Sequence, residues 1–285
     1  MAQPPLSQTY GLDAYRVASY LPERLVDEMY DGRQLGRLAA RKLVRKLSRG
    51  RLGSRSSAEQ VVAVYDGVAV LDRPEQHRGG LAFGRDFPRV LNELGVGRRP
   101  RLFEFCAGPA YIGYSLLAAG WCETLALSDI DAGAIETAQR TARLNGLEDR
   151  VSAYVSDALD AIPASESWDL VVANPPHFLP DPSRSEDAQV FDRDWTLHRR
   201  FYETVERHMR PGGLVIVVEN VAGSDPEAFE EMIRAGGGRP VTVHLGTDVR
   251  GKPNGLYYLV SEWGYSGADH LEQPRIEPVE VVASK

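Results

Sequence analysis

The sequence predicts an α/β fold in which a doubly wound, mostly parallel sheet of seven strands has helices on both faces. Two observations support this. From about residue 101, short apolar runs that resemble strands alternate with stretches that resemble helices, which is typical of parallel strands joined by helical crossovers. The segment PVTVHLGTDVRGKPNGLYYLVSEW breaks this alternation and predicts two antiparallel strands at the sheet edge.

Composition narrows the class of protein. The 285 residues, with 33 basic and 40 acidic side chains, can bury a core, which excludes fibrous, disordered and small disulfide-stapled proteins. There is no apolar run of about eighteen residues, and the first residues lack the pattern of a secretory signal, so we expect a cytoplasmic protein without a membrane partner. Cys106 and Cys122 fit a reducing compartment and cannot supply a cysteine-rich metal site.

The net charge of −7 is unevenly distributed. Residues 33–57 hold nine basic side chains and no acidic one, and the rest of the chain has a net charge of −16. Apolar residues recur there every four positions (Leu35, Ala39, Leu43 and Leu47), which predicts an amphipathic helix. Its basic face could hold nucleic-acid phosphates, lie on an anionic membrane, or simply be solvated or meet an acidic surface of the protein. We favour the last interpretation.

The part of the chain before residue 98 is expected to form a smaller domain of helices and one hairpin. A helix-forming stretch after Pro22 leads into a connector rich in Gly, Ser and Arg, and QVVAVYDGVAVL predicts two strands joined by a tight Asp66-Gly67 turn. We therefore divide the chain into this domain (1–97), the α/β domain (98–263) and a tail (264–285). The apolar helix stripe could also serve a homodimer.

The first strand of the α/β domain, RLFEFCA, continues into a turn of small residues, GPAYIG, and then a helix. Such a turn lets a ligand approach backbone N–H groups at a helix start. The dinucleotide fingerprint needs glycine at its first, third and sixth positions, but with Gly108 in the middle the other two are Cys106 and Tyr111. This disfavours a nicotinamide enzyme, and a purely structural turn stays open as an alternative.

Acidic residues end the next two predicted strands. Asp129 lies 21 residues after Gly108, where a carboxylate can accept hydrogen bonds from ribose hydroxyls. Asp131 is better suited to cap the following helix. Asp157, followed by Ala158, ends the third strand, where it could accept a hydrogen bond from the exocyclic amine of a purine. Together these strand ends predict one ligand crevice.

The fourth strand, DLVVA, ends in Asn174-Pro175-Pro176-His177. The order of EFCAGPAYIG, SDID, SDA, NPPH and MRPGG over about residues 98–263 resembles the Rossmann-like class I S-adenosylmethionine-dependent methyltransferases. The branch that it resembles has an Asn-Pro-Pro-aromatic motif and includes release-factor glutamine methyltransferases and adenine and guanine N-methyltransferases. The resemblance implies an enzyme that uses S-adenosyl-L-methionine and releases S-adenosyl-L-homocysteine. It assigns cofactor binding to Glu104, Cys106, Ala107, Gly108, Ala110, Gly113, Asp129, Ile130, Asp157, Ala158 and Asn174.

The Asn-Pro-Pro-His motif has a chemical rationale of its own. An amide, amine or guanidine nitrogen conjugated to a π system is a poor nucleophile, and two acceptors, the Asn174 side-chain oxygen and the Pro175 carbonyl, can orient its lone pair. The prolines fix an extended backbone. We predict Asn174, Pro175 and His177 as catalytic residues, with Pro176 against the substrate. His177 replaces the usual aromatic residue and either stacks on the acceptor, which we favour, or accepts a proton.

Cys106 and Ala110 also depart from the family's usual Gly-x-Gly, so contacts with the methionine end of the cofactor are expected to differ. The segment after the motif contains five acids, Asp181, Glu186, Asp187, Asp192 and Asp194. They either form a solvated loop or face inward and favour a cationic acceptor. We assign Asp192 and Asp194 to the substrate. His77 and Arg78, in the loop after the hairpin, are expected to meet a carboxylate of the acceptor.

Three functions remain open. The first, which we favour because no RNA-binding domain is recognisable, is N-methylation of a small molecule or free amino acid such as arginine in specialised metabolism. The second is methylation of a macromolecule, either an RNA base or a protein Gln or Arg, docked by residues 33–57. The third is an inactive nucleotide-binding module.

Overall fold

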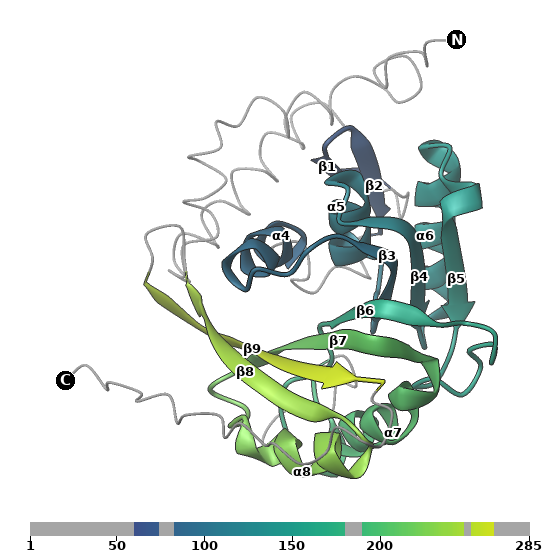
Figure 1. The fold of residues 1–285 in the computed structure, drawn as a ribbon. Coiled ribbons are helices and arrows are strands. Elements are labelled where there is room, and N and C mark those ends of the chain that lie inside the picture. Colours follow the sequence, from purple (N-terminus) through teal and green to yellow (C-terminus); the bar gives the residue numbers. More distant parts are fainter. Residues whose placement is uncertain (1–59, 74–82, 180–189, 248–251, 265–285) are drawn as a thin grey trace.

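The computed structural model describes residues 60–73, 83–179, 190–247 and 252–264. Figure 1 shows that they form one twisted sheet with helices on both sides and a small hairpin beside it. Several sequence predictions lie outside the described residues: the basic stretch 33–57, His77 and Arg78, the acids Asp181, Glu186 and Asp187, and the tail after residue 264.

The large sheet has seven strands, as predicted. They are β3 (Arg99–Phe105), β4 (Cys122–Asp129), β5 (Val151–Val155), β6 (Trp168–Ala173), β7 (Met209–Asn220), β8 (Arg239–Thr247) and β9 (Pro253–Trp263). Their order is β5-β4-β3-β6-β7-β9-β8; β9 is antiparallel to β7 and to β8, and the other neighbouring strands are parallel. The strand order reverses direction between β3 and β6, and in doubly wound sheets ligands bind at this switch point, beyond the carboxyl ends of the strands.

Helices cover both faces of the sheet (Figure 1). Leu102 of β3 packs in the cluster that includes residues of α4, α5 and α6, whereas its neighbour Phe103 packs in the cluster that includes residues of α7 and α8. This alternation follows from the pleat, and each such side chain contributes about 1.5–3 kcal/mol by burial.

None of the described helices is long and apolar enough to cross a membrane. The elements are α4 (Phe83–Glu93), α5 (Tyr111–Ala118), α6 (Ala132–Leu144), α7 (Thr196–Val205) and α8 (Glu227–Ala235), with 3-10 turns η3 (Glu148–Arg150), η4 (Arg193–Trp195) and η5 (Glu206–His208).

The predicted hairpin is confirmed as β1 (Gln60–Tyr65) and β2 (Val68–Asp72). Asp66 and Gly67 have φ values of 42° and 88°, which is the backbone that a tight two-residue turn requires. Strand β2 is joined to the end of α6: the side chain of Asn145, the residue after α6, accepts from the N–H of Ala69 at 2.9 Å and donates to its carbonyl at 2.8 Å. The hairpin is therefore fixed against the helices of the sheet, and the division of the chain at residue 97 stays a prediction.

Helix α4 was not predicted, because Pro88 lies inside it. Proline lacks the N–H that would donate to the carbonyl four residues earlier, here Gly84. The hydroxyl of Ser115 on α5 donates to that carbonyl instead. Phe87, Val90 and Leu91 are fully buried on the side of α4 that joins the core, so tertiary packing stabilises a helix that its own sequence disfavours.

Candidate functional site

The carboxyl ends of β3, β4, β5, β6 and β7 bring the predicted site residues to one edge of the sheet. The register places Phe105 of β3 beside Ser128 of β4 and beside Ala173 of β6, so the turn after β3 lies between Asp129 and Asn174. Three large apolar side chains are exposed at the ends of these strands, Ile130, Val155 and Val221, and Leu179 is exposed in the loop after β6.

The turn after β3 has an unusual backbone. Cys106, Gly108 and Ala110 have φ values of 54°, 51° and 65°, a left-handed conformation that costs non-glycine residues about 1–3 kcal/mol. Cys106 and Ala110 thus adopt the conformation for which glycine is preferred. Among the described residues, a Cβ placed on Gly108 would meet nothing within 4 Å, so this part of the structure leaves open space in front of the turn. Strained backbone and open space fit a loop that a ligand approaches closely.

Glu104 and Gly113 shape this turn from inside, and their assignment as cofactor contacts stays a prediction. Glu104 is only 2% exposed, and its Oε2 accepts a hydrogen bond of 2.7 Å from the Gly113 N–H. Burial raises the pKa of Glu104 to about 8. A Cβ on Gly113 would lie 2.6 Å from that same oxygen, so glycine permits the close packing of α5 on the sheet. Ala107, Ala110 and Ala158 are also buried.

Asp129 joins the ends of β3 and β4. Its Oδ2 accepts a hydrogen bond from the Gly108 N–H at 2.7 Å, and its Oδ1 accepts one from the Asp131 N–H at 2.9 Å. A carboxylate has about four acceptor positions, so two remain for the predicted ribose hydroxyls. Burial raises the pKa of this carboxyl. Asp131 caps α6 by accepting from the N–H groups of Gly133 and Ala134, as predicted.

Asp157 follows β5 at the predicted place, but its carboxylate is partly used. Its Oδ1 accepts a hydrogen bond of 2.9 Å from Arg200 of α7, whose guanidinium also bonds Asp160 at 2.8 Å. Asp157 is 55% exposed, so this ion pair is weak. A purine amine would have to share the carboxylate with Arg200.

The Asn-Pro-Pro-His motif leaves β6 with one acceptor unsatisfied. The side-chain Oδ1 of Asn174 is buried and has no hydrogen-bond partner in the described part of the chain. A buried polar atom without a partner costs about 1–3 kcal/mol, so this oxygen is available to accept a hydrogen bond from a ligand or a water molecule. Pro175 and Pro176 are buried. The loop after β7 packs directly on the motif, since a Cβ on Gly223 would overlap the His177 carbonyl.

A buried histidine, which the sequence did not reveal, lies between two carboxylates behind the motif. His198 of α7 is 2% exposed; its Nδ1 lies 2.7 Å from Asp192 Oδ2 and its Nε2 lies 2.9 Å from Glu219 Oε1. Burial alone would lower the pKa of His198, but the charges of Glu219 and Asp192 and their hydrogen bonds outweigh it and raise this pKa to about 9. His198 is therefore an imidazolium at neutral pH.

Glu219, at the end of β7, connects this histidine to the motif. It is fully buried, and its Oε2 lies 3.5 Å from His177 Nδ1. Burial would raise the pKa of Glu219, but the charge of His198 holds it below its usual value. The sequence contained one indication of this residue, an acid at the end of the apolar run LVIVVE.

The assignment of Asp192 to the substrate stays a prediction, although its carboxylate already has partners within the protein. Its Oδ1 accepts from the Leu197 N–H at 2.9 Å, and its Oδ2 accepts from the backbone and ring of His198. The carboxylate is thus used inside the protein at the start of α7, brought there by the pairing of Phe178 with Phe191. Asp194 is exposed, and its role in substrate binding stays a prediction.

The electrostatic environment of the site is negative. Burial and then the charges of Asp129, Asp192, Glu219 and Asp157 raise the pKa of the Cys106 thiol well above its usual value. The thiol is therefore protonated. Asp192 and Glu219 share the cation of His198, and Asp157 is paired with Arg200, so the negative charge that remains is that of Asp129 and of the buried group around His198.

The known proteins that this chain is similar to are methyltransferases. Residues 89–235 match the family model of the methyltransferase small domain. The chain is 27% identical over 138 residues to the release factor glutamine methyltransferase of Clostridium acetobutylicum, over 44% of this chain and 48% of that protein. It is 30% identical over 145 residues to the ribosomal protein uL3 glutamine methyltransferase of Bradyrhizobium diazoefficiens, over 46% and 44%.

A third relative is the ribosomal RNA small subunit methyltransferase C of Hahella chejuensis, 29% identical over 120 residues, or 42% of this chain and 31% of that protein. The chain thus spans about half the length, or less, of these relatives. Among solved structures it is similar to a SAM-dependent methyltransferase from Streptococcus mutans, described as putative, with a TM-score of 0.51 and 15% identity over 74% of this chain and 57% of that one. A structure of a methyltransferase complexed with SAH gives a TM-score of 0.50 at the same identity and coverage.

Proposed function

This chain belongs to the methyltransferase small domain family, and on that premise we propose that it transfers a methyl group from S-adenosylmethionine to a planar nitrogen of a macromolecule. The first candidate acceptor is the side-chain amide of a protein glutamine. When bound, the cofactor supplies an activated methyl group on a sulfonium.

The main support is the buried, unsatisfied Oδ1 of Asn174. An amide –NH2 group has two N–H donors, and this oxygen together with the Pro175 carbonyl provides two acceptors on one rigid segment. Hydrogen bonds to both would hold the nitrogen so that its lone pair, which is perpendicular to the amide plane, points towards the methyl group. Positioning of this kind can supply a large part of the acceleration of a transfer reaction.

The turn after β3 and Asp129 support binding of the cofactor. Asp129 retains acceptor positions for ribose hydroxyls, and the space in front of Gly108 is open. Ile130 is 69% exposed and offers an apolar surface for a purine. The solved relative complexed with SAH has the same fold, which is consistent with this placement.

We propose a macromolecular acceptor instead of the small-molecule acceptor that we favoured from the sequence. The named relatives are methyltransferases of a release factor, a ribosomal protein and ribosomal RNA, and these support the second hypothesis. The acids around Cys106 favour a neutral protein amide over RNA, because a phosphate backbone would be repelled at the mouth.

The test is transfer of label from methyl-tritiated S-adenosylmethionine to a ribosome and release-factor protein fraction, bulk RNA and an amino-acid pool, assayed in parallel. We expect label in protein that mass spectrometry locates as N-methylglutamine. Asn174→Ala should lower turnover by at least about 10²-fold, as expected for loss of a positioning contact, while cofactor binding measured by calorimetry stays near that of the wild type.

Label in RNA or in a free amino acid would refute the protein amide and identify another acceptor. An Asn174→Ala variant with wild-type turnover would refute the positioning role. A matched control is Asn92→Ala, since Asn92 is an exposed residue of α4 remote from the motif, and it should change neither measurement.

A further inference from the structure

The side chains of Asp192, His198, Glu219 and His177 contact one another in this order, and these contacts determine which of their nitrogen and oxygen atoms can carry a hydrogen. A carboxylate accepts hydrogen bonds and donates none. Since His198 faces a carboxylate oxygen at each ring nitrogen, both nitrogens must carry hydrogen. Asp192, His198 and Glu219 together then have a net charge of −1, which is buried directly behind the acceptor motif.

The same rule fixes the orientation of His177. Its Nδ1 is buried and lies 3.5 Å from Glu219 Oε2; neither atom has a hydrogen bond within the described ranges. A contact of this length is too long for a good hydrogen bond, but such contacts often tighten when a substrate binds. Because Glu219 can only accept, Nδ1 must carry the hydrogen, which leaves a lone pair on Nε2. The ring is 17% exposed although Nδ1 is buried, so its accessible part is the remainder of the ring.

We propose that Nε2 of His177 accepts the proton released by the methylated nitrogen, and that Glu219 and His198 are positioning residues that set this tautomer and stabilise the resulting imidazolium. The inference rests on the proposed function. In the reaction a nitrogen–carbon bond forms as the methyl–sulfur bond breaks, and the nitrogen becomes cationic while the sulfonium becomes a neutral thioether. The nitrogen–hydrogen bond then breaks, its electron pair stays on nitrogen, a hydrogen–Nε2 bond forms, and the imidazolium later releases the proton to water.

The surroundings of His177 favour this role over simple stacking. The charged groups that face it from the packed elements are Glu219 of β7 and, one contact further, His198 of α7 and Asp192 ahead of η4. Protonation of His177 would bring this buried group of charges from −1 to zero. An imidazole that only stacked on the acceptor would need no buried carboxylate at its Nδ1. His198 is needed because, without a cation beside it, a fully buried Glu219 would take up a proton.

The first test requires no activity. In nitrogen-15 NMR spectra of histidine-labelled wild-type protein, His177, assigned with the His177→Gln variant, should show a protonated Nδ1 and an unprotonated Nε2, and His198 should be protonated at both nitrogens at neutral pH. A hydrogen on Nε2 of neutral His177 would overturn the proposal, even if the protein proves to be an active methyltransferase. The wild-type spectrum decides this point even if variants at Glu219 fold poorly.

The second test uses the pH dependence of turnover on the identified acceptor. In the wild type kcat should depend on pH, because the step needs a free lone pair on Nε2 of His177. Glu219→Gln should lower kcat by roughly tenfold or more with little change in KM and should change this pH profile, because the imidazolium formed in the step loses its counter-ion. Glu219→Asp, which keeps the charge, should retain part of the wild-type profile.

Glu93→Gln is the matched control, because Glu93 pairs with His244 at 2.8 Å on the surface between α4 and β8; it should leave the pH profile unchanged. An unchanged profile in Glu219→Gln would refute the role of Glu219. Absence of any transfer by the wild type would refute the proposed function instead, while the NMR result would still decide the orientation of His177.

Discussion

Two histidine–carboxylate pairs in this protein have nearly the same separation and opposite surroundings. His198 Nε2 lies 2.9 Å from Glu219 Oε1, with side chains 2% and 0% exposed. His244 Nε2 lies 2.8 Å from Glu93 Oε2, with side chains 24% and 40% exposed. Distance alone would rank them as equal. Burial separates them, because water screens the second pair, whereas the first has given up its hydration and depends on its partners.

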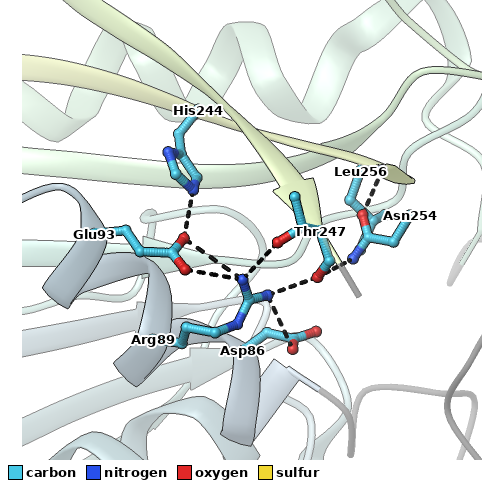
Figure 2. Close-up of polar contacts among 7 residues, drawn as sticks. All are labelled: Asp86, Arg89, Glu93, His244, Thr247, Asn254 and Leu256. Carbon is cyan, nitrogen blue, oxygen red and sulfur yellow. Dashed lines mark hydrogen bonds and ion pairs between the residues drawn. The ribbon is translucent and has the colours of Figure 1, made fainter. Parts of the chain in front are cut away.

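Figure 2 shows the exposed pair in its setting, the polar cluster between α4 and the β8–β9 pair. Arg89 donates to the Thr247 hydroxyl at 2.9 Å and to the Thr247 carbonyl at 2.8 Å, and it also contacts Glu93 at 3.2 Å. Asp86 lies 3.6 Å from the same guanidinium. Positive and negative side chains alternate in this cluster, and solvent reaches them. If one of them is removed, water can take its place as a partner of the others. Water cannot replace the partners of Glu219 in this way, because Glu219 is fully buried.

The largest effect is expected from His198→Gln. The variant removes the cation between two buried carboxylates, and breaking a buried pair in this way costs about 3–5 kcal/mol. Urea unfolding at neutral pH measures the loss. The contribution of His198 should be fully present below pH 6.5 and disappear as the pH rises through about 9, since its folded pKa lies above its ordinary value of 6.5.

His244→Gln is the matched control for this experiment, with an expected loss of at most about 1 kcal/mol because the pair is exposed. Equal losses in the two variants would contradict the comparison and would mean that water reaches the buried pair.

A second test asks whether depth or the partner determines the charge of a carboxyl group. Glu104 and Glu219 are 2% and 0% exposed, yet burial raises the pKa of Glu104 to about 8 whereas His198 holds that of Glu219 below its usual value. The folded state thus keeps a proton on Glu104 that the unfolded chain releases above pH 4.5. Stability due to this group is highest below pH 4.5 and falls as the pH rises to about 8.

Glu104→Gln should remove that slope, which is at most about 1.4 kcal/mol per pH unit, and its amide oxygen can still accept from Gly113. The difference in unfolding free energy between wild type and variant, followed from pH 4.5 to about 8, measures it. Glu148→Gln, at an exposed glutamate in η3, should produce no such difference. A constant difference for Glu104→Gln would show that Glu104 is ionised in the folded protein.

The same contrast explains what the sequence could predict. Strand runs, the Asp66-Gly67 turn and the Asp131 cap depend on neighbours in the chain, and all are confirmed. Helix α4 was missed because its compensation for Pro88 comes from Ser115 of another helix. Asp192, His198 and Glu219 resemble an ordinary loop acid, a helix histidine and a strand-end acid. Their connection exists only after α7 has packed beside β7, so no local pattern could reveal it.

The smallest effect, expected from Arg89→Ala, asks whether charge or hydrogen-bond geometry holds the exposed cluster together. Arg89 is about one-third exposed, so its ion pairs should contribute little, and we expect a loss near 1 kcal/mol, mainly from its two hydrogen bonds to Thr247. Arg89→Lys keeps the charge but not the planar fork that reaches both Thr247 oxygens, so it should lose nearly as much. Unfolding measured at low and high salt separates the two causes: if geometry dominates, the losses hardly change with salt. A lysine variant as stable as the wild type, with a loss in the alanine variant that high salt abolishes, would mean that charge holds α4 to β8. In that case, burial would no longer explain why this exposed cluster differs from the buried His198–Glu219 pair.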